Sequence, residues 1–387
     1  MFDGINLTAI IIANLMGIVI IFTVAITYNW RLDRKAADTK ALLVLVVAST
    51  LSCIVDPICF LADGQPGMLN YLLVLIGNTL LYVTNVTCAI AWVLFICYHL
   101  GVNLKKWHLW TLAGIYAALM VLLVINFFVP IVFTISEVGG NPNTYGRTAM
   151  YWVYLVAQFG LLLSALPIYF YAQAKSAHLR MFPVWAFILP VLIGATIQTV
   201  FYGVSTIAPF IAVSLGCVTS SLQKELLFRD KLTGLYNRFY LNLMENKIKE
   251  KRQSTFTMIM LDINRFKSIN DSYGHLAGDN ALVETAHILN KVVAESGAVI
   301  RYAGDEFIII LNLQDEQETS LRIAKIHEAL ASYNKTSGKP YEITVSLGYD
   351  RFNFNEKTMD EILGIIDKRM YENKQAYYER MGQPTER

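Results

Sequence analysis

The sequence predicts two folds in one chain: an all-α bundle of seven transmembrane helices over residues 1–222 and an α+β domain with a central antiparallel sheet over residues 230–387. A short linker helix over 223–229 joins them. Three observations predict this division. Residues 1–223 carry nine Lys/Arg and six Asp/Glu, whereas the last 164 residues carry 23 and 24. Long uncharged runs fill the first part, and helical and strand-like patterns alternate in the second.

Uncharged stretches long enough to cross a bilayer recur through the first part of the chain. A helix needs about 20 apolar residues to cross a hydrocarbon core of about 30 Å, and a chain inside lipid must be helical to satisfy its backbone. The run over 181–223 has 43 residues. At a rise of about 1.5 Å per residue this is too long for one crossing, so we divide it near YGVST at 202–206. The crossings are then 4–30, 41–62, 68–104, 107–136, 148–174 and the two halves of 181–223.

The first run has no basic residues before it and no A-x-A cleavage site after it, so we interpret it as a retained span.

Basic residues predict the orientation of the bundle. The loops 29–40, 98–108 and 173–181 hold eight Lys/Arg, whereas the alternate segments hold one, Arg147. Cytoplasmic loops are enriched in Lys and Arg. The sequence therefore predicts an external N-terminus and a cytoplasmic C-terminal domain.

Polar side chains at membrane depth have two interpretations, interhelical hydrogen bonding or a ligand pocket. Asp56 is the strongest sensor candidate, because an intramembrane charge is costly unless it serves a function. The segment SEVGGNPNTYG is too short for a separate sensor domain, so we expect any sensed compound to be small and held among the helices. The residues concerned are Asn14, Asp56, Asn78, Asn85, Asn126, Gln158 and Gln198.

The C-terminal part reads as alternating helices and strands. After a helix at 221–228 and the turn-rich DKLTGLYNR, a helix runs to about residue 252, and TFTMIMLDI (255–263) is a buried strand. Two helices follow, the second over about 277–296, and then AVIRY and EFIIILN form a hairpin around Ala-Gly. A helix over 316–333, the strand YEITVSLGYD and a helix over 358–380 complete the order α-β-α-α-β-β-α-β-α. This order is typical of a ferredoxin-like α+β sandwich.

Three carboxylates gather at one edge of this predicted sheet. TFTMIMLDI ends near Asp262, and the hairpin turn RYAGDEF places Asp305 and Glu306 at the start of a neighbouring strand. Clustered carboxylates raise one another's pKa values, and a hard divalent cation such as Mg²⁺ relieves that repulsion. Two such ions can serve phosphoryl transfer. A solvated acidic turn is the alternative. The net charge of +2 gives no support to nucleic-acid binding.

Four motifs, in order, resemble the GGDEF family of diguanylate cyclases, and the resemblance covers about 226–387. RYAGDEF resembles the signature turn, and DKLTGLYNR (230–238) resembles the opening D-x-L-T-G-L-x-N-R. LDINRFKSINDSYGHLAGDNAL (261–282) resembles the central motif, and IIDKRMYENK (365–374) the closing one. The resemblance implies that the C-terminal domain is a nucleotide-cyclase-like palm. With the predicted spans, we expect a bacterial protein of the cytoplasmic membrane whose cyclase domain lies in the cytoplasm. The resemblance also implies a homodimer that joins two GTP molecules, one per subunit, into cyclic di-GMP.

The resemblance also implies roles for individual residues. Two Mg²⁺ ions per site, or Mn²⁺ in their place, would be held by Asp262, the Ile263 carbonyl, Asp305 and Glu306. Glu306 would act at the metal or in deprotonating the ribose 3′-hydroxyl. Asn270 and Asp279 would bind the guanine edge, Lys267 and Lys374 the phosphates, and Asp230 would pair with Arg238. Each of these residues has a plainer interpretation as a helix cap or a solvated charge.

Several positions depart from the family pattern. Ala303 replaces the first glycine of the signature, which would cost about 1–2 kcal/mol if that position requires a positive φ. Asn264 stands where the family often has a second Asp, and Tyr378 stands where an arginine is usual. These departures leave an alternative open, a catalytically degenerate GTP-binding module that regulates a partner protein. A third interpretation is a receptor or transporter whose soluble domain only responds to nucleotide.

Overall fold

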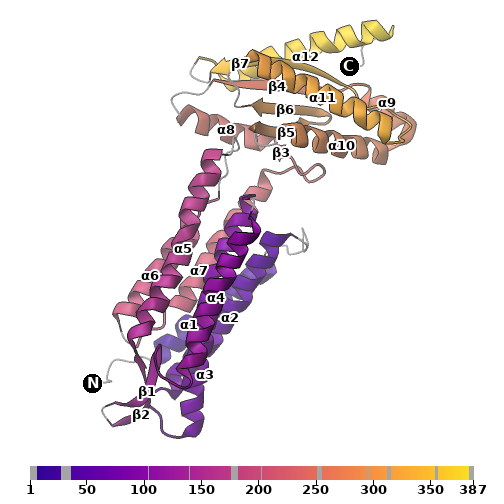
Figure 1. Cartoon of the computed structure of the whole chain (residues 1–387). Coiled ribbons are helices and arrows are strands. Elements are labelled where there is room, and N and C mark those ends of the chain that lie inside the picture. The colour runs from indigo at the N-terminus through magenta and orange to yellow at the C-terminus, as the bar shows by residue number, and fades with distance from the viewer. Residues whose placement is uncertain are drawn as a thin grey trace. The chain divides into compact units, whose positions relative to one another are not determined.

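The structure is a computed structural model of the whole chain. It describes residues 7–27, 36–102, 104–138, 140–175, 182–201, 203–250, 255–293, 296–311, 315–353 and 356–382, without the side chains of 174–175 and 246–250. The chain divides into two compact units, and the division falls between Gln223 and Lys224 (Figure 1). Each unit is described by itself. The predicted cytoplasmic residues Arg31, Arg34, Lys35 and Arg180, and the side chain of Lys175, lie outside the described parts.

The N-terminal unit consists of long apolar helices and one β-hairpin. A break at 201–206 separates its last two helices, where the sequence predicts the division of the longest apolar run. The helices are α1 (Leu7–Thr27), α2 (Ala37–Ala62), α3 (Met68–His99), α4 (Lys106–Asn126), α5 (Ala149–Lys175), α6 (Trp185–Val200) and α7 (Ile207–Leu227).

Five of these helices, α1 to α5, are long and apolar enough to cross a membrane. Of the seven predicted crossings, five are therefore supported by the length and hydropathy of a helix. Helix α6 is apolar but has 16 residues, below the about 20 of a full crossing. Helix α7 has 21 residues and ends in the polar sequence QKELL, which lowers the hydropathy of its last turns.

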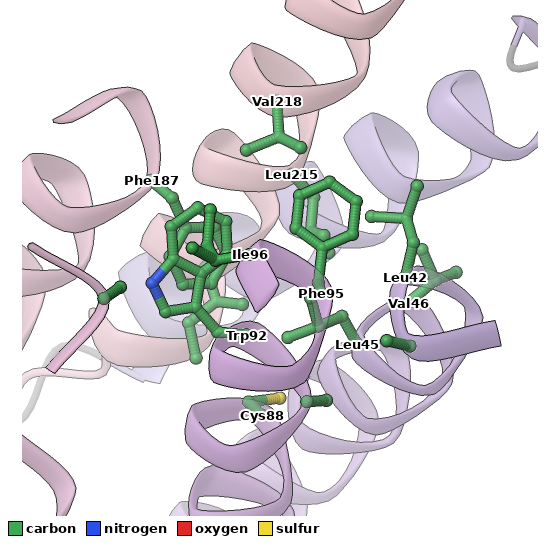
Figure 2. Packing of buried hydrophobic residues seen from close by; sticks show 14 of the residues in the cluster. Leu42, Leu45, Val46, Cys88, Trp92, Phe95, Ile96, Phe187, Leu215 and Val218 are labelled. Atoms are coloured by element: carbon green, nitrogen blue, oxygen red, sulfur yellow. The ribbon is translucent and has the colours of Figure 1, made fainter. Parts of the chain in front are cut away.

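The bundle core is built mainly from α2, α3, α6 and α7, with further residues from α1 and α5. Figure 2 shows the indole ring of Trp92 against Phe187, with ring centroids 4.0 Å apart and an interplanar angle of 13°. Trp92 is fully buried, and so are Leu45 of α2 and Leu215 of α7. Burying such side chains contributes roughly 1.5–3 kcal/mol each. Segments far apart in the sequence are thus held together as one core.

The sequence prediction contains no strands in the N-terminal unit, but the structure has a hairpin between α4 and α5. It pairs β1 (Phe133–Val138) with β2 (Asn141–Arg147) in antiparallel register. The side-chain oxygen of Asn126 accepts hydrogen bonds from the backbone N–H groups of Val132 and Phe133, at 2.7 and 3.2 Å. Asn126 is therefore a structural residue that joins the end of α4 to the hairpin.

The C-terminal unit is the predicted α+β domain. Its five-stranded sheet has the order β3-β5-β6-β4-β7, with β4, β6 and their outer neighbours antiparallel (Figure 1). The short β3, parallel to β5, is an addition to the predicted order. The elements are β3 (Tyr236–Asn237), α8 (Arg238–Glu250), β4 (Thr255–Ile263), α9 (Phe266–Tyr273), α10 (His275–Val293), β5 (Gly297–Ala303), β6 (Glu306–Leu311), α11 (Glu316–Thr336), β7 (Val345–Asn353) and α12 (Met359–Met381).

Helices cover both faces of the sheet because the side chains of β4 alternate between two apolar clusters. Ile259 and Leu261 pack with α10 and α11 on one face. Met258 and Met260 pack with α8 and α12 on the other. Successive strand residues point to opposite faces. Asp262 therefore belongs to the face that α12 covers.

Candidate active site

The end of β4 and the start of β6 bring two carboxylates together. In the antiparallel pairing of these strands, Asp262 lies directly opposite Glu306. Side chains directly opposite on neighbouring strands lie on the same face with their Cβ atoms about 5 Å apart. Asp305 occupies the turn beside them, and its carbonyl oxygen accepts a hydrogen bond from the backbone N–H of Ile263 at 3.4 Å. Three acidic residues therefore gather at one end of the two central strands.

A lysine from α12 balances part of this negative charge. Lys374 Nζ donates a hydrogen bond to Asp262 Oδ1 at 2.7 Å, and both side chains are mostly buried. The pKa of Lys374 lies above its usual value: burial favours the neutral amine, but the bond to Asp262, the charge of Asp262 and the charge of Asp305 together outweigh it. The lysine therefore remains an ammonium group.

The three carboxyl groups all have pKa values above their ordinary range. Burial is the largest cause for each of them. The charge of Asp262 raises the pKa of Asp305 and of Glu306 further. Burial raises the pKa of Asp262, and the ion pair with Lys374 lowers it. The effect of burial is the larger, so the pKa lies above its ordinary value. More negative charge is thus collected here than one lysine can neutralise.

The donor chemistry of this cluster suits a hard divalent cation. Within the described ranges, no three or more His, Cys, Asp and Glu side chains lie close enough together to hold a metal ion as they stand. All donors at the strand ends are nevertheless oxygens, and the charge of Asp262 adds to burial in raising the pKa values of Asp305 and Glu306. Carboxylate and carbonyl oxygens are the ligands that Mg²⁺ prefers. The residues fit such an ion once Lys374 releases Asp262.

The acidic turn is anchored by Arg301, which the sequence reasoning missed. Arg301 donates from Nε to the carbonyl oxygen of Gly304 and from Nη1 to Asp230 Oδ1, each at 3.0 Å. The expected pairing of Asp230 with Arg238 is therefore wrong. The parallel pairing of β3 with β5 sets Asn237 beside Arg301 and so brings the loop that contains Asp230 to this arginine. Burial would raise the pKa of Asp230, but hydrogen bonds from Thr233 and Arg301 lower it.

Ala303 causes no backbone strain. Among the described residues, the only non-glycine positions with positive φ are Asn143 and Arg265, whereas Gly304 has a φ of 46°. Gly304, and not Ala303, therefore adopts the left-handed conformation in this turn. The predicted cost of Ala303 does not arise, since its φ lies in the ordinary negative range.

Helices α9 and α10 bring Asn270 against Gly278, the residue that precedes Asp279. A Cβ atom at Gly278 would lie 2.0 Å from Asn270 Oδ1, so only glycine allows this approach. Gly274 ends α9 with a φ of 85° and lets the chain turn into α10. The amide of Asn270 is therefore held against the first turn of α10, next to Asp279.

The other residues singled out from the sequence lie in varied settings. Lys267 is exposed on α9. Asn264 is buried and structural: it accepts a hydrogen bond from the Ser346 hydroxyl at 2.6 Å. Tyr378 is 2% exposed and packs in the core, and Arg380 donates to the Ala376 carbonyl in its own helix. Asp56 is buried in α2 of the N-terminal unit.

Comparison with known proteins identifies the C-terminal unit. Residues 227–380 match the family described as "Diguanylate cyclase, GGDEF domain". Diguanylate cyclase A of Treponema denticola is 32% identical over 166 residues, which are 41% of this chain and 44% of that protein. Diguanylate cyclase DgcZ of Escherichia coli is 34% identical over 149 residues, which are 38% of this chain and 50% of that protein. The chain thus spans half or less of the length of these relatives.

Solved structures are also similar to this unit. The GGDEF domain of DgcB from Caulobacter crescentus, in complex with c-di-GMP, is 24% identical and aligns with a TM-score of 0.35. That alignment covers 38% of this chain and 91% of the DgcB domain. The family match covers none of residues 1–226. The C-terminal part of the chain, residues 227–380, is a GGDEF domain.

Proposed function

We propose that this chain is a membrane-bound bacterial diguanylate cyclase that joins two GTP molecules into cyclic di-GMP under the control of its N-terminal helices. The observation that carries the proposal is the pairing of Asp262 with Glu306 beside Asp305, in a domain that matches the GGDEF family. The pKa values of Asp305 and Glu306 are raised, which is typical of a functional site. They therefore favour a site that binds a cation and phosphates over a solvated turn.

The reaction consists of two equivalent displacements. The ribose 3′-oxygen of one GTP forms a bond to the α-phosphorus of the other, the bond between the α- and β-phosphates breaks, and pyrophosphate leaves. The hydroxyl proton passes to Glu306 or through it to water. A second displacement closes the ring and releases a second pyrophosphate. Magnesium, or manganese, bound by Asp262, Asp305, Glu306 and the Ile263 carbonyl would stabilise the charge on the attacking and leaving oxygens.

The remaining residues would hold the nucleotide. Asn270 of α9 and Asp279 of α10 would bind the guanine edge. The ionised carboxylate of Asp279 would accept hydrogen bonds from the guanine N–H groups, and the amide of Asn270 can donate as well as accept. Lys374, released from Asp262, and the exposed Lys267 would bind phosphates as point charges. Since one domain holds one GTP, catalysis requires a homodimer with two facing domains.

The N-terminal unit would anchor the enzyme in the cytoplasmic membrane and act as its sensor. We propose seven crossings, with α6 and α7 in addition to the five long helices, because the basic residues then fall on one side. The N-terminus would be outside and the cyclase domain inside. Helix α7 ends at Leu227, four residues beyond the division between the units, so it connects the bundle directly to the catalytic domain.

The test is synthesis of cyclic di-GMP by the full chain in detergent with GTP and Mg²⁺. We expect product from the wild-type protein and a loss of at least about 100-fold in Glu306→Gln, in line with loss of a general base. Glu328→Gln, which changes an exposed acid on α11, is the matched control and should retain full activity. GTP binding without product in the dimeric wild-type chain would contradict the proposal and support the degenerate GTP-binding module instead.

A further inference from the structure

A cavity of about 120 Å³ lies within the N-terminal unit, lined by polar and apolar residues of α2, α3, α5, α6, α7 and the hairpin strand β2. Five of the seven polar residues singled out from the sequence line it: Asp56, Asn78, Asn85, Gln158 and Gln198. A water molecule needs roughly 10–15 Å³ of such space. The cavity can therefore hold several waters, or a compound of up to about ten non-hydrogen atoms.

The cavity contains a buried carboxylate without a cationic partner. Asp56 is 5% exposed; it accepts a hydrogen bond from the hydroxyl of Ser205, and the side chain of Asn14 lies within hydrogen-bonding reach of it. Ser205 in turn accepts a hydrogen bond from Asn14 Nδ2 at 2.8 Å, so its own hydrogen is committed to Asp56. Among the residues that the structure describes, no Lys, Arg or His lies within ion-pair distance of Asp56. A buried charge in this state is costly without a compensating group.

The same cavity contains a cation without an anionic partner. Arg147 donates to the carbonyl oxygens of Thr199 and Gln198, at 3.0 and 2.8 Å, and its guanidinium lies 4.8 Å from the ring centroid of Tyr151. No carboxylate lies within ion-pair distance of it in the described part of the chain. Asp56 and Arg147 thus line one space as opposite charges that do not neutralise each other. A second carboxylate, Asp63, also lines this space and accepts a hydrogen bond from the backbone N–H of Tyr145 at 2.8 Å.

Two amide side chains in the cavity are free to bind a ligand. Asn85 and Gln158 line it, and neither makes a hydrogen bond within the described residues. By contrast, Gln198 is already committed, because its side-chain oxygen accepts from the backbone N–H groups of Thr206 and Ile207 at the start of α7. The cavity therefore offers uncommitted donors and acceptors beside Asp56 and Arg147.

We propose that this cavity binds a small zwitterionic amino compound of amino-acid size. Its ammonium group would pair with Asp56, its carboxylate with Arg147, and the amides of Asn85 and Gln158 would bind its remaining polar atoms. Such a ligand supplies both missing counter-charges at once, which neither an apolar compound nor a singly charged ion does. The site would serve the sensory role proposed above, but its occupancy is measurable without any cyclase reaction.

The test uses the full chain in detergent and measures thermal unfolding with each of the twenty proteinogenic amino acids in turn. Calorimetric titration then gives the Kd of those that stabilise the protein. We expect at least one to bind, and its decarboxylated amine and its deaminated acid to bind at least about tenfold more weakly, since each loses a charge-assisted hydrogen bond. If no amino acid binds, or if the amine alone binds as tightly, the proposal is wrong.

Variants of the residues that line the cavity test whether the ligand binds there. Asp56→Asn keeps an acceptor for Ser205, and Arg147→Lys keeps the charge; each should raise the Kd at least about tenfold. Gln158→Met removes an amide that makes no bond within the described residues, so it should fold normally and still weaken binding. Glu137→Gln, an exposed acid of β1 outside the cavity, is the control and should bind like wild type. Equal affinity in Asp56→Asn and wild type would overturn the assignment. Cyclase activity, assayed separately, does not enter either result.

Discussion

At the residue scale, the acidic cluster of the GGDEF domain is a region of unfavourable charge in the metal-free protein. Burial and the neighbouring charges of Asp262, Asp305 and Asp367 raise the pKa of Glu306, and Lys374 only partly offsets them. The folded protein therefore binds this proton more tightly than the unfolded chain does. Linkage then requires that the free energy of unfolding falls as the pH rises from about 4 through the raised pKa.

Glu306→Gln should therefore stabilise the metal-free protein at neutral pH. Because the amide carries no charge, we expect the melting temperature of the variant at pH 7 to exceed that of wild type by about 1–3 °C. The difference should vanish below about pH 4, where the wild-type carboxyl is protonated in both states. Thermal unfolding of the full chain with a chelator, across this pH range, measures the effect.

The control for this prediction is Glu328→Gln, an exposed acid on α11. Its melting temperature should match that of wild type throughout. A lower melting temperature for Glu306→Gln at pH 7 would show that Glu306 stabilises the fold, contrary to the direction of its pKa shift.

At the element scale, the close contact of α9 with α10 positions the residues proposed to bind guanine. Gly278→Ala places a methyl group where Asn270 Oδ1 now lies, so the amide must move away. We expect the KM for GTP to rise about tenfold, the loss associated with one good hydrogen bond, while kcat changes less. Steady-state kinetics of cyclic di-GMP formation measures both.

Gly364→Ala is the matched control for Gly278→Ala. Gly364 lies on an exposed side of α12, and a Cβ atom there meets nothing within 4 Å. Alanine should stabilise this helix by up to about 1 kcal/mol and leave the KM unchanged. An unchanged KM in both variants would show that the position of Asn270 does not matter for GTP.

The elements of the two units were predictable to different degrees. The order of helices and strands in the GGDEF domain follows from long apolar periodicities, and the pairing of β4 with β6 follows from their buried sequences. Strand β3 has two residues, too few for any periodic signal, and exists only because Tyr236 and Asn237 pair with β5 some 64 residues later. The β1–β2 hairpin was missed since many of its residues are polar and part of its support comes from Asp63, at the end of α2 and 82 residues before Tyr145.

The candidate active site, too, could be predicted from the sequence only in part. Asp262, Asp305 and Glu306 could be brought together from the sequence because strand order alone places them at neighbouring strand ends. The partner of Asp230 could not, since Arg301 lies 71 residues away along the chain and meets it only through β3. Sequence resemblance favoured a local arginine, Arg238. A resemblance between motifs does not show which side chain, distant in the sequence, lies next to Asp230.

At the scale of the whole molecule, the proposed topology places the β1–β2 hairpin outside the cell and the loop between α3 and α4 inside. Cysteine labelling tests this. In a Cys217→Ser background, in which the four remaining cysteines are buried, Glu137→Cys should react with a membrane-impermeant maleimide in intact cells. Lys105→Cys should react only after permeabilisation. The reverse pattern would contradict the proposed orientation.

The bond between Lys374 and Asp262 has a consequence for how strongly the metal and the nucleotide affect each other's binding. One ammonium group cannot hold Asp262 and a phosphate at the same time, and a cation on Asp262 would displace it. Metal binding would then free Lys374 for the nucleotide, and nucleotide binding would free Asp262 for the metal. Thermodynamic reciprocity requires the two effects to be equal. Magnesium and GTP should therefore bind this domain with positive cooperativity, each lowering the Kd of the other by the same factor.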